Sequence, residues 1–129
     1  MKTLLIVTAV IEVSAGAALL LAPALSVALL LGSSLDTPAS LTVGRLTGAA
    51  LLSLGVACWL ARLNGQNWLA RGLVVAMVLY NIAAVVILGA AGVRSQPIGV
   101  VLWPAVVLHG AMAVWCIMCL KMKLNESPQ

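Results

Sequence analysis

Three polar side chains that can relay a proton or ligate a metal ion interrupt long apolar stretches of this sequence: Glu12, Asn81 and His109, the only histidine. An ionisable group in an apolar, lipid-like setting is costly unless it is paired, so such residues are functional candidates by default. Arg45 and Tyr80 lie in the same kind of stretch and bring a cation and a phenol. These five residues form the candidate polar cluster.

Two interpretations of this cluster stay open. In the first, Glu12 is the proton-binding carboxylate and His109 is its hydrogen-bond partner or a second titrating group, as in proton-coupled transport. Asn81, Tyr80 and Arg45 then lie alongside. In the second, Glu12 pairs with Arg45. Asn81 bonds His109, and the cluster only specifies how the helices pack.

A second set of candidate ligands follows His109 at helical spacing: Met112, Cys116 and Cys119. Such side chains bind soft metals like Cu(I), but His109 and Cys119 would lie about 15 Å apart along a helix, too far to share one ion. The remaining metal or thiol-redox candidates are Cys58, Cys116 and Cys119. Cysteine is also a good small buried hydrophobe. We favour this interpretation, so no metal and no cofactor is expected.

The composition places these residues in membrane-spanning helices. Of 129 residues, 64% are hydrophobic and 8% are charged, and the mean hydropathy is +1.19, whereas a soluble domain carries about 25% charged residues. A helix of about 20 residues crosses a hydrocarbon core about 30 Å thick. We expect one four-helix transmembrane domain over residues 1–129, with helices at about 4–31, 39–61, 69–91 and 98–120 and a tail at 121–129.

The expected fold class is all-α, a polytopic membrane protein with an antiparallel four-helix bundle. Backbone groups in lipid are satisfied only in helices or closed barrels, and these runs do not alternate as barrel strands do. The first run is too long for one straight crossing, and Pro23 predicts a kink near Ala22. Thr37 as N-cap and Pro38 at the first helical position predict the start of the second helix.

The basic residues predict the orientation, because Lys and Arg gather in cytoplasmic loops. With the N-terminus in the cytoplasm, the inside carries Lys2, Arg62, Arg71, Lys121 and Lys123, and the outside carries Arg45 and Arg94. Both termini are therefore expected in the cytoplasm. The basic residues form no patch with interleaved aromatics, so the net charge of +4 does not indicate nucleic-acid binding.

The polar groups fall at one depth on this topology. At about 1.5 Å per residue, Glu12 lies about 12 Å and Asn81 about 18 Å from the inner edge, and His109 about 16 Å from the outer edge. In a core about 30 Å thick, all three lie in a band around the midplane. Arg45 is about 9 Å from the outer edge, and its long side chain can reach toward them.

Gly44, Gly48 and Gly55 predict a packing face on the second helix. Gly44 and Gly48 form a G-x-x-x-G pattern, and small residues let helices approach closely in lipid. We expect this face to pack within the bundle, with another subunit as the alternative partner.

Two resemblances bear on function. The stretch IEVSAGAAL at residues 11–19 resembles the first helix of small multidrug resistance transporters, in which a glutamate binds a proton and a cationic drug in a dimer. This likeness covers Glu12 and the number of helices; the aromatic residues of that family's drug site have no counterparts, and the chain has no Phe. Most of the chain is similar to uncharacterised bacterial four-helix small integral membrane proteins, on residues 16–23, 44–55, 58–62, 80–81 and 102–109, which implies a bacterial inner membrane setting.

Two function classes follow. The first is a non-enzymatic membrane subunit or scaffold, which acts through helix–helix contacts as a homo-oligomer or within a larger membrane complex. The second is a small proton-coupled transporter that uses Glu12 as its midplane carboxylate. A thiol or metal redox protein using Cys116 and Cys119 is a third class. Apart from the lipid bilayer, the identity of any partner is not encoded in a motif.

Overall fold

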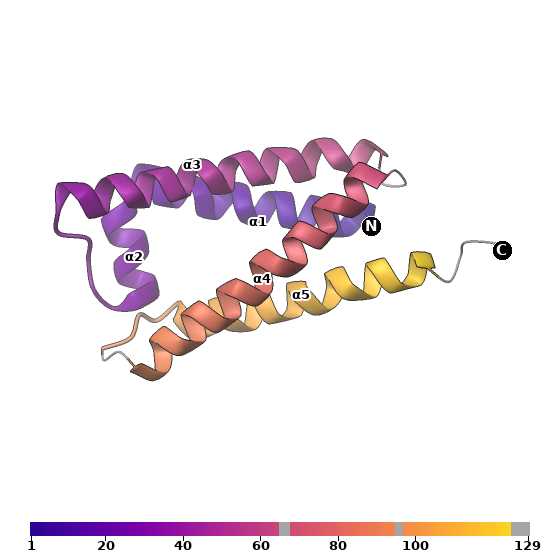
Figure 1. Cartoon of the computed structure of the whole chain (residues 1–129). Helices are drawn as coiled ribbons and strands as arrows, with labels where there is room; N and C mark the ends of the chain where they lie inside the picture. Colours follow the sequence, from indigo (N-terminus) through magenta and orange to yellow (C-terminus); the bar gives the residue numbers. More distant parts are fainter. Residues whose placement is uncertain (65–67, 95–96, 125–129) are drawn as a thin grey trace.

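The computed structural model describes residues 1–64, 68–94 and 97–124, and these ranges are helical apart from short connections (Figure 1). The elements are α1 (Lys2–Leu21), α2 (Pro23–Leu31), α3 (Pro38–Ala61), the short 3-10 helix η1 (Arg62–Asn64), α4 (Trp68–Arg94) and α5 (Leu102–Leu124). Four helices are long and apolar enough to cross a membrane, namely α1, α3, α4 and α5 as far as Met122. The chain therefore has the helices that an integral membrane protein requires.

The first predicted helix, 4–31, is two helices rather than one kinked helix. Pro23 has no N–H to donate to the preceding turn, and its ring keeps the residue before it out of the helical conformation. Ala22 accordingly has φ −136° and ψ 63°, and α2 begins at Pro23. In Figure 1, α2 turns away from α1 and runs toward the start of α5.

The last helix begins four residues later than the predicted position 98. The backbone N–H of Val101 donates to the carbonyl of Leu29 at 3.0 Å, so this loop is tied to α2. Gly99 lies so close to α2 that a Cβ atom there would overlap the backbone of Leu29 and Leu30. The helix then continues through Leu124, past the predicted start of the tail at 121. Residues 125–129 of that tail lie outside the described residues.

The start of α3 confirms the predicted N-cap. The Thr37 side chain accepts a hydrogen bond from the Ser40 backbone N–H at 3.1 Å, and the Ser40 hydroxyl accepts one from the Thr37 N–H at 3.2 Å. This reciprocal pair satisfies two backbone donors that the first helical turn leaves free. Pro38 occupies the first helical position, where no donor is needed.

Glycines bring α1 and α3 into backbone contact. A Cβ atom on Gly48 would lie 2.6 Å from the Leu20 nitrogen and 2.7 Å from the Gly16 carbonyl oxygen. Gly55 likewise lies against Val13 of α1, with 2.7 Å to its Cγ2. Gly44, Gly48 and Gly55 are all buried. The predicted glycine face therefore packs inside the chain, against α1 and the beginning of α2.

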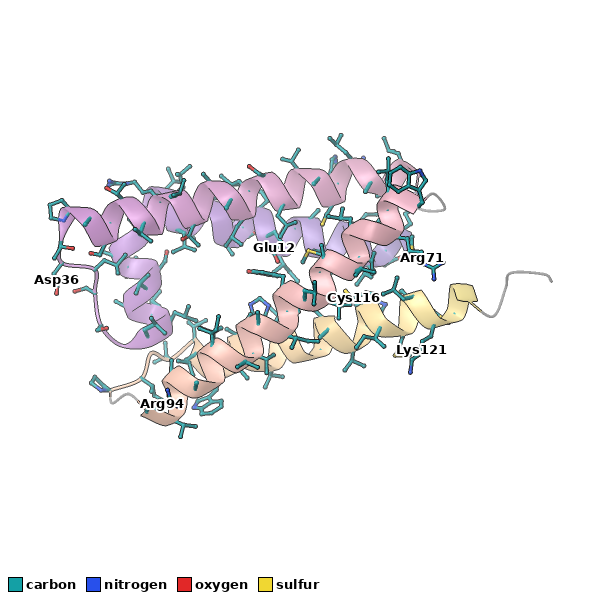
Figure 2. All side chains as sticks on the ribbon, viewed as in Figure 1. Glu12, Asp36, Arg71, Arg94, Cys116 and Lys121 are labelled. Carbon is teal, nitrogen blue, oxygen red and sulfur yellow. The ribbon has the colours of Figure 1, made fainter. Side chains whose placement is uncertain are left out.

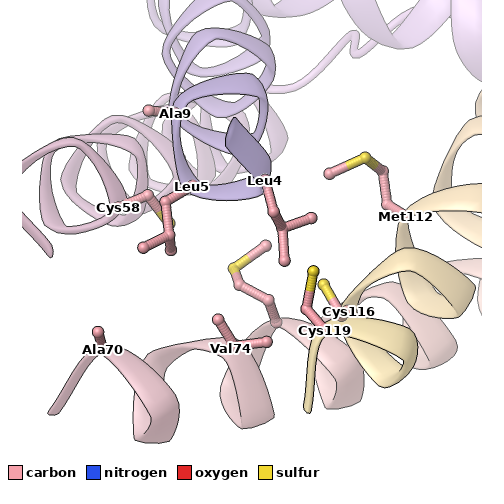
Figure 3. Packing of buried hydrophobic residues seen from close by; sticks show 10 residues of the cluster. Leu4, Leu5, Ala9, Cys58, Ala70, Val74, Met112, Cys116 and Cys119 are labelled. Carbon is pink, nitrogen blue, oxygen red and sulfur yellow. The ribbon is translucent and has the colours of Figure 1, made fainter. Parts of the chain in front are cut away.

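α4 packs along α5, and this second pair meets the first pair at a core of apolar side chains. Figure 3 shows this core, with Leu4 and Leu5 of α1 facing Val74 of α4 and the cysteines of α5. The start of α1 and the end of α5 lie at the same end of the molecule (Figure 1). The two pairs are thus joined at that end by the core.

Because α1 and α3 approach so closely, one methyl group added at Gly48 should strongly lower the stability of the protein. Gly48→Ala should lower the free energy of unfolding by about 1–3 kcal/mol, because the added Cβ would meet backbone that cannot rotate away. Gly72→Ala is the matched control, since nothing lies within 4 Å of a Cβ there. Unfolding followed by circular dichroism in mixed detergent micelles would measure both. Equal stability of the two variants would contradict the account of this contact.

Candidate functional site

Glu12 is buried between the two helix pairs. Its residue is 3% exposed although it carries a carboxyl group in the middle of an apolar helix. Thr8 and Gly16, one helical turn to either side, are buried on the same face of α1. Figure 2 shows Glu12 on the side of α1 that faces α4. The carboxyl group is therefore inside the protein rather than in lipid.

Tyr80 of α4 is the direct partner of Glu12. The two side chains share a hydrogen bond, in which the phenol O–H is the donor to a carboxylate. The Tyr80 ring also meets the His109 ring edge to face, with 5.5 Å between the centroids and 82° between the planes. Tyr80 thus links Glu12 on α1 to His109 on α5.

Asn81 and His109 form the second contact of the cluster. The Asn81 amide nitrogen donates to the Met77 carbonyl at 2.7 Å, so its Oδ1 is the acceptor that remains. This oxygen lies 2.8 Å from Nδ1 of His109. The ring must therefore carry a hydrogen on Nδ1 and donate it to Asn81. In the neutral ring, Nε2 is then the nitrogen with a free lone pair.

The structure brings together four of the five predicted cluster residues and leaves Arg45 apart. Arg45 is exposed on α3, and it lines neither of the two cavities that Glu12 borders. Its neighbour Gly44 occupies the buried face against α1 and α2, which turns Arg45 outward. The depth of Arg45 along α3 would allow a contact with Glu12. The direction in which Arg45 points around the axis of α3 does not. Among the described residues, no ion pair joins Glu12 to Arg45.

A large cavity lies on one side of Glu12. It is half-open, with exposed Thr47 and Ile87 in its lining, and has a volume of about 580 Å³ with walls from all five α-helices. Most of the lining is apolar, including Leu19, Leu30, Leu51 and Ile87. The cluster residues Glu12, Tyr80 and His109 supply most of its polar groups. This volume is within the range of about 300–1,000 Å³ that is usual for small-molecule sites.

A second, much smaller cavity lies on the other side of Glu12. Its volume is about 10 Å³, and its polar lining consists of Thr8, Glu12, Asn81 and His109. Met77 and Met112 of the apolar core also line it. Glu12 and His109 border both cavities, so they form part of the wall between them.

The three cysteines lie in the apolar core. Cys58, Cys116 and Cys119 are buried free thiols that pack with Leu4 and Met77. Among the residues that the structure describes, no group of three or more His, Cys, Asp or Glu side chains is placed to hold a metal ion. Met112, which follows His109 by one turn, is also buried in this core. The helical face running from His109 to Cys119 thus divides into a polar part and an apolar part.

Thr8 is a member of the site that the sequence interpretation missed. It precedes Glu12 by four residues, which is one helical turn, and this spacing was the available signal. Threonine is common in membrane helices, where it bonds its own backbone, so the residue type alone does not single it out.

Comparisons of the chain with protein-family models, curated sequences and solved structures found no match. The geometry therefore carries the functional argument.

The contact between α4 and α5 can be measured by a double-mutant cycle on Asn81→Ala and His109→Ala. Hydrogen bonds between membrane helices couple by about 0.6 kcal/mol on average and up to about 1.7 kcal/mol, and we expect a value in this range. Unfolding in mixed micelles supplies the four free energies. A control cycle pairs Asn81→Ala with Ser53→Ala, an exposed residue that bonds the Ala49 carbonyl of its own helix. Strict additivity for the first pair would refute the contact.

Proposed function

We propose that this protein is a small proton-coupled membrane transporter whose central cavity binds a mostly apolar molecule with one positive charge. The observation that carries the proposal is the position of Glu12, a buried carboxyl group in the wall of a cavity of about 580 Å³. Buried carboxyl groups at membrane depth are typical of proton-coupled transport. The likeness of the first helix to small multidrug resistance transporters agrees with this proposal.

The charge of the cavity favours a cation. Among the described residues that line it, Glu12 is the one acidic side chain, and none is Lys or Arg. The Nδ1 atom of His109 is already engaged with Asn81. The Tyr80 ring adds an aromatic surface, which attracts cations. An anionic ligand would meet the Glu12 carboxyl group and find no lysine or arginine in this lining.

The binding of a proton is coupled to the binding of the ligand because the site has a single carboxyl group for both. In an apolar cavity an isolated carboxylate is costly, so Glu12 is stable when it is protonated or paired with a cation. A proton and a cationic ligand therefore compete for the same carboxyl group. Binding of one favours release of the other, and this competition is the requirement for exchange across a membrane.

The proposed topology is an antiparallel bundle with four membrane crossings and both termini in the cytoplasm. Arg71 and Lys121 lie at the end of the molecule where α1 starts, and Arg94 lies at the opposite end (Figure 2). The excess of basic residues at the first end agrees with the rule that cytoplasmic loops are positive. A bacterial inner membrane is the proposed setting, as the resemblance to bacterial four-helix proteins implies.

The alternative function, a non-enzymatic subunit or scaffold, has weaker support. Its strongest argument was the glycine face of α3, formed by Gly44, Gly48 and Gly55. These residues lie against α1, Pro23 and Leu35 of the same chain, so the face is already occupied. Assembly into a homo-oligomer or a larger complex would need another surface and stays a prediction.

Transport by Glu12 can be tested in liposomes that enclose a pH-sensitive dye. A gradient of benzyltrimethylammonium, a permanent cation with one phenyl group, should drive opposite proton movement through the wild type. Glu12→Gln keeps the shape of the side chain and removes its exchangeable proton, so the flux should fall to that of protein-free liposomes.

Two controls separate the site from general effects. Asp36→Asn removes a carboxylate from an exposed loop, where Asp36 accepts a hydrogen bond from Ser34, and should retain the flux. Tyr80→Phe removes the hydrogen bond to Glu12 and should lower the flux without abolishing it. Wild-type flux in a folded Glu12→Gln protein would overturn the proposed function.

A further inference from the structure

Thr8 differs from the other helical hydroxyl residues whose bonds are known in this structure, among which the N-terminal Ser40 of α3 donates to the Thr37 carbonyl. Ser26, Thr42, Thr47 and Ser53 each donate to the backbone carbonyl four residues earlier, at 2.8–2.9 Å. The Thr8 residue is 2% exposed, and within the described part of the chain its Oγ1 has no hydrogen-bond partner. An unpaired buried hydroxyl costs about 1–3 kcal/mol, so this group is expected to have a partner that is not a protein atom.

The small cavity beside Thr8 identifies that partner by its size and lining. Its volume of about 10 Å³ matches the lower limit of about 10–15 Å³ for one water molecule. A buried water also needs two to four polar neighbours, and here Thr8, Glu12, Asn81 and His109 line the space. Larger ligands do not fit, and the large cavity lies on the other side of Glu12.

We propose that this cavity binds one water molecule, which connects Thr8 to Glu12 and gives the carboxyl proton a first acceptor outside the ligand cavity. The inference rests on the proposed function, since it assigns a path to the proton that Glu12 exchanges. The Thr8 hydroxyl fixes the water by one hydrogen bond, and the cluster residues supply the others.

The proton transfer that this water allows is balanced. The O–H bond of the Glu12 carboxyl group breaks, and its proton passes to the water oxygen. The water gives one of its own protons to Nε2 of His109, the ring nitrogen that does not bond Asn81. The products are a carboxylate, a neutral water and an imidazolium. No oxidant, reductant or further reactant is needed.

The arrangement places the water on the side of Glu12 away from the larger pocket. Glu12 and His109 border both cavities, so the carboxyl group can face a ligand on one side and the water on the other. Met77 and Met112 lie beyond the water and belong to the apolar core that joins the helix pairs.

Infrared difference spectroscopy in H₂¹⁸O tests the inference without any ligand. A pH step that titrates Glu12 should produce an O–H band of an isolated water that shifts with the oxygen isotope. Groups that face Glu12 and can contribute to the pH step are Cys58 on α3, Tyr80 on α4 and His109 on α5. Glu12→Gln identifies the carboxyl band by its loss.

The decisive variants are Thr8→Val, which keeps the shape and removes the hydroxyl, and Thr8→Ser, which keeps the hydroxyl. The isotope-sensitive band should disappear in Thr8→Val and persist in Thr8→Ser. Persistence of the band in Thr8→Val, or a band that shifts when Na⁺ replaces choline, would overturn the proposal.

An experimental map of the wild type gives a check that needs no variant. A solvent peak should lie within hydrogen-bond distance of Thr8 Oγ1, and a well-resolved map without such a peak would also overturn it. These results are independent of liposome flux. If Glu12→Gln transports normally, the proposed function fails while the water band still decides this inference.

Discussion

The burial of one carboxyl group constrains the rest of this structure. Glu12 lies in an apolar helix and is nearly inaccessible, so its polar atoms must be satisfied inside the protein. Tyr80 on α4 provides a hydrogen bond, and His109 and Asn81 extend the polar contacts to α5. The cluster therefore connects the two helix pairs near the middle of the chain's apolar interior, where apolar packing alone would not fix their register.

The two helix pairs differ in how closely they approach, and this difference leaves room for the cavity. Glycines let α1 and α3 touch through their backbones. The pairs themselves meet through larger side chains at one end, where Leu4, Met77 and Cys116 belong to an apolar core. Toward the opposite end, α2 folds across and the loop before α5 is tied to Leu29, and a half-open pocket of about 580 Å³ lies there. The cavity thus results from tight contact within one pair and looser contact between the pairs.

The sequence was sufficient to predict the helices and most of the polar cluster. It was not sufficient to predict how each helix is rotated about its own axis. Long apolar runs, Pro23, and Thr37 with Pro38 predict where the spans begin and break. Residue counting places Glu12, Asn81 and His109 at one depth. Both faces of these helices are apolar, because one faces lipid and the other faces protein, so no stripe of hydrophobicity reports which way a residue points. For this reason the sequence did not show that Arg45 is exposed on α3, away from the two pockets that Glu12 borders, or that Thr8 lines one of them. The turn of α2 and the loop at Gly99 depend on contacts distant in sequence.

The central claim is that a proton and a cation compete for Glu12. The most direct measurement is proton release when benzyltrimethylammonium binds to the detergent-solubilised protein in weak buffer, over a series of pH values. The account predicts release of about one proton per bound cation where Glu12 is protonated, with tighter binding as the pH rises. The neutral isostere neopentylbenzene should bind without release, and Glu12→Gln should release none. Cation binding without proton release, or equal release from Glu12→Gln, would contradict the account.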